Sequence, residues 1–199
     1  KENTIKRLGL DKPLHVQYWK FFKGSLTLDF GNSIRTKQPA LQMVKERFGN
    51  SIKLASAAVL FGVIISIPLG ILAAVNRKGI LDRLAMTIAL LGQSVPAFFS
   101  GIIAIYIFSE YSTLLPVQGA ESWKSYVLPA ITLGWILAAG MTRLLRASML
   151  EILDSEFIKL ARAKGLSERT VVFKHAFRNA MIPLVTFIAY TWGIIIGAA

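Results

Sequence analysis

The charged side chains best placed to do chemistry lie in one stretch, residues 151–183, which separates two long apolar segments. This stretch has six Lys and Arg residues against four Asp and Glu residues, and His175 adds a cation when it is protonated. It is too polar to cross a bilayer, and its basic balance is typical of a loop that faces the cytoplasm. We therefore predict that it presents a recognition surface to a cytoplasmic partner.

The local pattern predicts a helix, a break and a second short helix within this stretch. Between residues 155 and 164, four apolar residues share roughly one side of a helix: Phe157, Ile158, Leu160 and Ala161. Gly165 is expected to end this helix, because glycine adopts the left-handed conformation without a Cβ penalty. Ser167 is placed to cap the second helix, with Glu168 in its first turn.

The same stretch resembles the cytoplasmic loop of binding-protein-dependent ABC importer permeases, in their peptide/nickel branch. The resemblance is carried by ARAKGLS at 161–167, His175, Arg178-Asn179-Ala180 and Pro183. The general signature of these permeases is Glu-Ala-Ala, three residues, Gly, nine residues and Ile-x-Leu-Pro. Here Lys159, Leu160 and Ala161 stand in place of Glu-Ala-Ala, and Pro183 lies five residues late. Shorter matches extend the resemblance over nearly the whole chain: Asp29-Phe30-Gly31, Asn50-Ser51, Ile67-Pro68-Leu69-Gly70 and Leu115-Pro116-Val117.

This resemblance implies a permease subunit, which is not an enzyme, and a loop that acts as the coupling helix for a separate ATPase. The residues implied in the ATPase contact are Phe157, Leu160, Ala161, Ala163, Gly165 and Leu166. The implied partners are ABC ATPase subunits, a second permease subunit, identical or homologous, an extracytoplasmic solute-binding protein and membrane lipid. Relatives that look alike at this level carry peptides, nickel chelates, haem or oligosaccharide-like solutes, so the cargo class stays open.

Composition alone also places the chain in a membrane, since 54% of its residues are hydrophobic and only 17% are charged. Four apolar runs are candidate spans: residues 54–75, 84–108, 126–142 and 179–199. We predict an all-α polytopic membrane bundle, and the family resemblance implies that these are about four of six transmembrane helices in a bacterial or archaeal inner membrane. In the first run, small residues recur every fourth position and predict a close helix contact: Ala58, Gly62, Ser66, Gly70 and Ala74.

The second run has polar residues and a proline at its middle, namely Gln93, Ser94 and Pro96. A proline there frees a backbone carbonyl that a neighbouring helix, a hydroxyl or pore water must satisfy. Two interpretations stay open: these residues line a translocation pathway, or they form a structural kink.

Loop charges orient the chain, because residues 76–83 and 143–178 carry three and eight Lys/Arg, whereas 109–125 carries one. The first two loops are therefore expected in the cytoplasm. By parity, residues 1–51 form an extracytoplasmic lead segment, and residues 52–199 form a partial transmembrane domain with a coupling loop at 151–178.

The aromatic cluster Tyr18-Trp19-Lys20-Phe21-Phe22 lies either at the lipid interface or beneath the turn at Gly24, and the second interpretation is favoured.

Several function classes are disfavoured by what the sequence lacks. No Gly-Lys pair forms a Walker A loop, no HExxH occurs, and the two histidines are expected on opposite sides of the membrane. We therefore predict no catalytic residues, no metal and no cofactor. The net charge is +12, but no segment combines basic and aromatic residues as a nucleic-acid-binding element does. No nucleic acid is therefore expected as a partner. A secondary transporter or channel is disfavoured because no carboxylate lies in the four apolar runs, and it remains the alternative beside a membrane scaffold.

Overall fold

The computed structural model describes residues 12–111, 115–116, 119 and 122–198. Within these residues the secondary structure is helical, apart from an isolated antiparallel bridge between Asn32 and Pro39. The prediction of an all-α fold is confirmed. The chain divides into two compact units, Lys1–Asn50 and Ser51–Ala199.

The first unit contains helix α2 (Leu14–Leu26), which is followed by turns before helix α3 (Ala40–Val75) begins. No residue of α2 is buried. Tyr18 and Trp19 are 63% and 55% exposed, so the aromatic cluster does not pack beneath the turn at Gly24 as the favoured interpretation had it. A Cβ at Gly24 would instead meet the backbone of Asp29.

Helix α3 is longer than the predicted span of residues 54–75, because it begins at Ala40 and has 36 residues. Its first part, residues 40–53, is polar but rich in helix formers such as Leu41, Lys45 and Glu46 and contains no proline. Within the apolar part, all five members of the predicted small-residue stripe are buried, which confirms that face as a packing surface.

The stripe packs against helix α6 (Val127–Leu153), which the short helix η1 (Trp123–Tyr126) precedes. A Cβ on Gly134 would lie 2.6 Å from the carbonyl oxygen of Ala58, and a Cβ on Gly70 would lie 2.9 Å from Leu145 Cδ2. The two helices therefore approach so closely that no side chain larger than that of glycine fits at positions 70 and 134. The third predicted span, 126–142, is only part of α6, which continues without interruption past Arg146.

The predicted second span, residues 84–108, is not one kinked helix but two helices, α4 (Ile80–Ser94) and α5 (Ala97–Tyr111), bent by 95° at their junction. Proline disfavours a helical conformation in the residue before it and supplies no N–H of its own. Val95 is accordingly extended, with φ −92° and ψ 122°. The local effect of Pro96 is therefore a break rather than a kink.

The bent pair runs from one end of α6 toward the other. Helix α4 begins beside Arg146, in the C-terminal half of α6. Helix α5, by contrast, lines a pocket with Ser125, Leu128 and Pro129 at the start of α6. This course favours one broken span over a re-entrant loop. By length and composition, the described residues then contain up to four membrane spans: the three long helices of α3, η1–α6 and α8–α9, and the bent pair.

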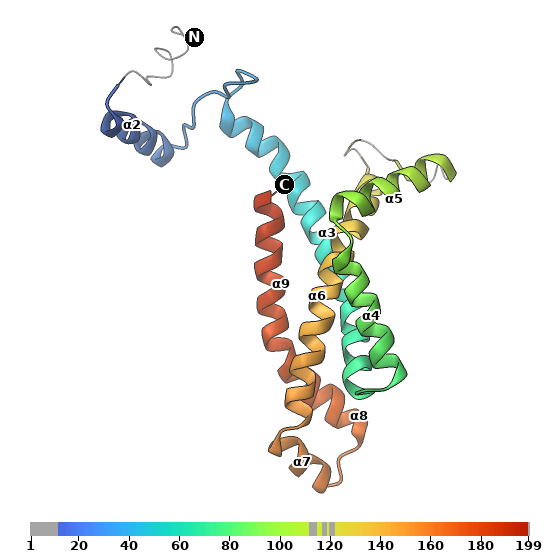
Figure 1. Cartoon of the computed structure of the whole chain (residues 1–199). Coiled ribbons are helices and arrows are strands. Elements are labelled where there is room, and N and C mark those ends of the chain that lie inside the picture. Colours follow the sequence, from blue (N-terminus) through green and yellow to red (C-terminus); the bar gives the residue numbers. More distant parts are fainter. Residues whose placement is uncertain (1–11, 112–114, 117–118, 120–121, 199) are drawn as a thin grey trace. The chain divides into compact units, whose positions relative to one another are not determined.

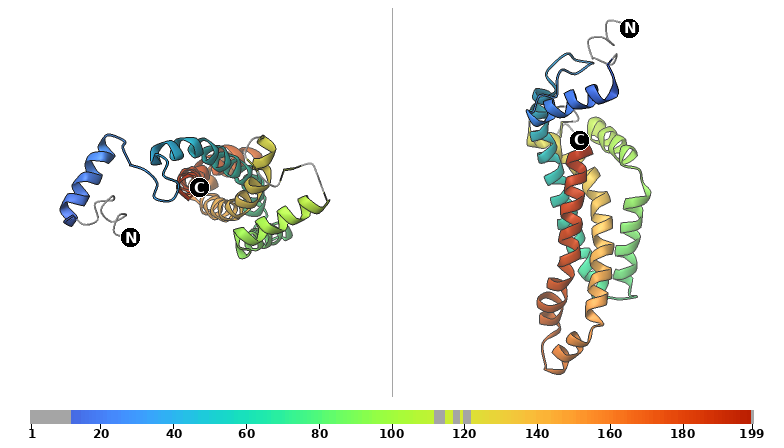
Figure 2. Two further views of the ribbon diagram at one scale, coloured as in Figure 1. Left: turned by 90° about the horizontal axis from the view of Figure 1, so that it is seen from above. Right: turned by 90° about the vertical axis from the view of Figure 1, so that its left-hand side faces the viewer.

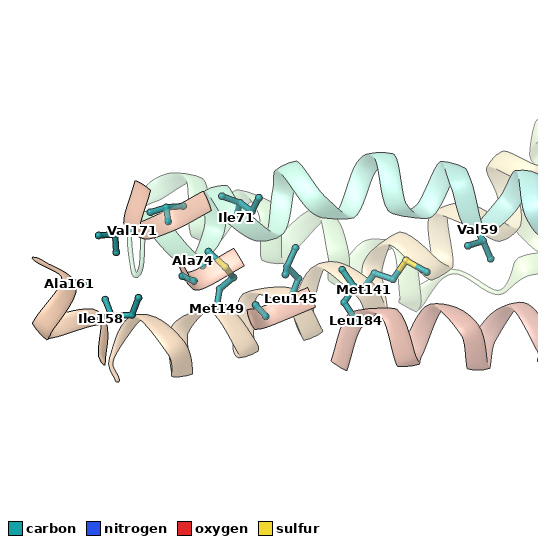
Figure 3. Close-up of a cluster of buried hydrophobic side chains, with 13 residues drawn as sticks. Val59, Ile71, Ala74, Met141, Leu145, Met149, Ile158, Ala161, Val171 and Leu184 are labelled. Carbon is teal, nitrogen blue, oxygen red and sulfur yellow. The ribbon is translucent and has the colours of Figure 1, made fainter. Parts of the chain in front are cut away.

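The last run forms helix α9 (Arg178–Ala198), close to the predicted 179–199. Figures 1 and 2 show α6 between α9 and α4. A Cβ on Gly140 would lie 3.3 Å from the ring of Phe187, and Trp192 Nε1 donates a hydrogen bond to Ser56 Oγ of α3 at 3.2 Å. One hydrophobic core joins α3, α6 and α9 (Figure 3), and its largest fully buried members on α6 are Met141, Leu145 and Met149.

Candidate functional site

The first helix of the charged stretch is α7 (Glu156–Ala163), and it ends as the sequence predicts. Gly165 has φ +79°. The amides of Gly165 and Leu166 donate to the carbonyls of Arg162 and Ala161 at 2.9 and 3.3 Å. This pair of bonds is a Schellman motif, which satisfies carbonyls at the helix end and requires the left-handed residue that glycine supplies.

The second helix begins as predicted but is not short. Ser167 Oγ accepts a hydrogen bond from the backbone N–H of Thr170 at 3.4 Å and caps α8 (Glu168–Thr170). Helix α8 then continues through a π-helical segment, η2 (Val171–Phe177), into α9. Because no glycine or proline lies between Ser167 and Pro183, nothing in this sequence ends the helix. The charged stretch therefore leads directly into α9, which is part of a candidate membrane span.

Helix α7 divides its apolar residues between two faces, whereas the sequence analysis placed them on one side. Ile158 and Ala161 are buried. Phe157 and Leu160 are 44% and 62% exposed, and Ala163, Gly165 and Leu166 are exposed as well. Five of the six residues implied in an ATPase contact thus form an accessible apolar surface, which we call the α7 patch: Phe157, Leu160, Ala163, Gly165 and Leu166. Ala161 is the exception, because it faces the interior of its own chain.

The buried face of α7 is continuous with the core of the membrane helices. Ile158 and Ala161 belong to one cluster with Met149 of α6, Val171 of η2 and Ala74 at the end of α3. Figure 3 shows Ile158 and Ala161 at one end of this cluster. Close-packed side chains transmit displacement, since they cannot be compressed independently. A force applied to α7 is therefore passed to α6 and to the α8–α9 run.

Exposed ion pairs hold the outer parts of the loop together. Lys159 pairs with Glu156 at 2.7 Å, and Arg162 Nε donates to Glu168 across the Gly165 elbow at 2.7 Å. The hydrogen bond to Glu168 raises the pKa of Arg162 above its ordinary value. Because these side chains are well exposed, each pair contributes little to stability and mainly selects a geometry.

A buried ion pair, which the sequence analysis missed, holds α4 against α6. Arg146 donates from Nε to Asp82 Oδ1 at 2.5 Å and from Nη2 to Asp82 Oδ2 at 2.7 Å. The side chain of Asp82 is only 6% exposed and that of Arg146 is 25% exposed. The backbone N–H of Lys78, whose φ is +62°, also donates to Asp82 at 2.9 Å. The sequence carries no spacing signal for this pair, because 64 residues separate its members.

The α3–α4 loop and the α6–α7 turn lie at the same end of the bundle. Arg77 of the first donates a 2.7 Å hydrogen bond to Asp154 of the second. These loops were expected on the same side of the membrane from their positive charge alone.

Most of the chain matches a known protein family. Residues 66–199 match the model of the family described as the binding-protein-dependent transport system inner membrane component. The chain belongs to this family. All of the site residues named above lie within the matched region. The family description places the chain in the inner membrane, in agreement with its apolar helices.

Curated relatives in the family extend the similarity to the first unit. The chain is 42% identical over 198 residues to the glutathione transport system permease protein GsiC of Escherichia coli (strain K12), which covers 100% of this chain and 65% of that protein. It is 41% identical over 194 residues to GsiC of Salmonella typhimurium (strain LT2), covering 98% of this chain and 63% of that protein. The chain thus spans less than two thirds of the length of these relatives.

The candidate pathway residues lie together at the break between α4 and α5. This break is at the end of α4 that lies far from the α7 patch (Figure 1). Gln93, Ser94 and Pro96 are all exposed. Ser94 Oγ donates to the carbonyl of Leu90 at 2.8 Å, which satisfies its hydroxyl within α4. A Cβ on Gly140 would lie 3.6 Å from Gln93 Nε2, so the Gln93 side chain reaches α6.

Proposed function

We propose that this chain is part of a permease subunit of an ABC importer, in which α7 docks in a groove of a separate ATPase subunit. The observation that carries this proposal is the α7 patch, an exposed apolar surface on a helix whose opposite face is anchored in the core by Ile158 and Ala161. Apolar residues gathered on the exposed side of a charged loop are suited to a protein partner.

The mechanism that we propose is a shift between two populated conformations. Closure of two ATPase subunits on ATP displaces α7. The core cluster that Ile158 and Ala161 share with Met149 and Val171 passes that displacement to the membrane helices. A solute-binding protein outside the cell biases the same equilibrium from the other side. A second permease subunit completes the pathway, and ATP hydrolysis stays on the ATPase.

For the cargo, we propose a small peptide, and glutathione is the first solute to test. The support is the identity of 41–42% to permeases named for glutathione transport. We further propose that residues 76–83 and 151–178 face the cytoplasm, that residues 1–51 are extracytoplasmic, and that Gln93, Ser94 and Pro96 line the pathway. The contact between Arg77 and Asp154 supports a common side for the first two segments.

Cysteine labelling of the full-length permease tests this topology, and the 199-residue sequence contains no cysteine of its own. Single cysteines at Lys78 and Ser167 should react only with reagent added from the cytoplasmic side, and one at Gly119 only from the outside. A cysteine at Gln93 should react with a small polar reagent to an extent that changes when nucleotide is trapped on the ATPase. Labelling of Gly119 and Ser167 from one side contradicts the topology, and protection of Gln93 in every state contradicts the pathway role.

The docking role is tested by two glutamates placed two residues apart. Ala163→Glu puts a charge on the exposed α7 patch, so the permease should fold normally but retain at least tenfold less ATPase on co-purification. Ala161→Glu puts the same charge into the core, where an unpaired carboxylate should lower the free energy of unfolding by at least about 3 kcal/mol. Thermal unfolding in detergent and the ATPase:permease ratio distinguish the two effects.

Lys174→Ala serves as the control, because this exposed residue lies on η2, outside the α7 patch. It should change neither stability nor ATPase retention. If Ala163→Glu bound ATPase and transported solute as the wild type does, the docking role would be wrong. The contact between the permease and its ATPase would then have to lie outside the α7 patch.

A further inference from the structure

Helix α2 separates its residues into an aromatic face and a lysine face. Leu14, Tyr18 and Phe22 follow one another at intervals of four, which places them along one side of the helix. Trp19, Phe21 and Leu26 flank that row. Lys20 and Lys23 lie on the opposite side, and α2 contains no acidic residue.

Within the described residues of the first unit, nothing covers the aromatic face. Phe21 is 66% exposed, and none of the residues of α2 is buried. The rings instead stack on one another: Tyr18 and Trp19 both stack on Phe22, at centroid separations of 6.1 and 5.6 Å. Exposing several large apolar side chains to water costs free energy. We therefore expect another molecule to cover this face of α2.

The composition of the helix indicates which occupant. Tryptophan and tyrosine are enriched where hydrocarbon meets headgroups, and lysine extends its ammonium group toward the headgroups from a buried stem. Lys23 Nζ lies 5.7 Å from the Trp19 ring centroid, at the border between the two faces. With 13 residues, α2 is about 20 Å long and too short to cross the hydrocarbon core. An amphipathic helix of this kind lies along a membrane surface.

We propose that α2 is an interfacial anchor that lies on the bilayer, with its aromatic face among the acyl chains and with Lys20 and Lys23 among anionic phosphates. A bilayer is a partner to which the chain itself is bound, because α3, the next helix along the sequence, is a candidate membrane span. The positive charge of α2, with no acidic residue to offset it, is complementary to an anionic headgroup layer. This inference is independent of the docking role of α7.

Two matched single-cysteine variants of the full-length permease, Tyr18→Cys and Lys20→Cys, test this arrangement because they lie two residues apart on opposite faces. Each is labelled with an environment-sensitive fluorophore in nanodiscs of phosphatidylcholine with 30% phosphatidylglycerol. A lipid carrying a shallow spin label should quench the probe at position 18 several-fold more than the probe at position 20. The emission at position 18 should also shift to shorter wavelength relative to detergent solution.

Two further arms separate the alternatives. Lys20→Gln with Lys23→Gln, in the Tyr18→Cys background, should reduce the extra quenching gained from phosphatidylglycerol but not that seen in phosphatidylcholine alone. Equal quenching at positions 18 and 20 overturns the proposal. So does a probe at position 18 that stays in water until a purified solute-binding protein is added, because the face would then belong to that protein.

Discussion

Replacing Asp82 with leucine should lower the free energy of unfolding of the detergent-solubilised permease by about 3 kcal/mol. Breaking one side of a buried ion pair costs about 3–5 kcal/mol, because the remaining charge is left without a partner. We expect the lower end of that range, since 25% of the Arg146 side chain is exposed and water can hydrate part of it. The measurement is unfolding by heat or denaturant, followed by circular dichroism or by retention of monodispersity.

Arg146→Leu should be at least as destabilising, because it leaves the more deeply buried partner uncompensated. Asp82 would keep only the hydrogen bond from the Lys78 amide. The double variant, Asp82→Leu with Arg146→Leu, should cost clearly less than the sum of the single variants, because no unpaired charge remains.

A matched control comes from the exposed ion pair at the same end of the bundle. The side chains of Arg77 and Asp154 are 51% and 62% exposed. Arg77→Ala should therefore change stability by less than about 1 kcal/mol, as is usual for surface pairs. If Asp82→Leu unfolded at the wild-type midpoint, or if its effect matched that of Arg77→Ala, the pair would not hold α4 against α6.

This pair also marks a limit of what the sequence predicts. From the sequence, Asp82 fell within the loop 76–83 and Arg146 within the loop 143–178. Their contact depends on how α4 packs on α6, which no local pattern encodes. An ion pair between residues 64 positions apart can be identified only when the packing of the helices is known.

Local features were predicted best, because each depends on a few neighbouring residues. Gly165 and Ser167 have the conformation and cap expected of them, since a left-handed helix end and an N-cap are decided within one turn. The stripe from Ala58 to Ala74 was found from its spacing of four, which is independent of the partner that covers it.

Features that depend on tertiary packing were predicted less well. The helical pattern showed that α7 is apolar on part of its surface, but it did not reveal that Ala161 faces inward while Ala163 faces outward. Pro96 indicated a disturbance of the second span, but the sequence did not predict the 95° angle between α4 and α5, nor that α5 would lie beside the start of α6. A run of apolar residues also underestimates the length of a helix that continues into polar sequence, as α3 and α6 both do.

Gly165→Asp should abolish transport while the permease still folds, inserts and purifies normally. A residue with a Cβ pays about 1–2 kcal/mol in the left-handed conformation, and aspartate is among the residues that tolerate it best. Apart from its sequence neighbours, no atom of the described residues lies within 4 Å of a Cβ built at Gly165, so the substitution creates no clash with them. We therefore expect a large loss of transport to come from a partner that the new side chain meets. Transport of labelled solute into proteoliposomes, with solute-stimulated ATP hydrolysis, measures the loss.

A series at this position separates backbone strain from contact with the ATPase. Alanine adds little bulk but tolerates φ +79° poorly, whereas asparagine tolerates it well and is as bulky as aspartate. If α7 docks closely at Gly165, Gly165→Asn should be nearly as inactive as Gly165→Asp, and Gly165→Ala should keep most transport with a slightly lower unfolding midpoint. The reverse order, with alanine the most inactive, would assign the effect to the Schellman motif and not to docking. Wild-type transport by Gly165→Asp, with the ATPase bound, would remove this elbow from the coupling surface.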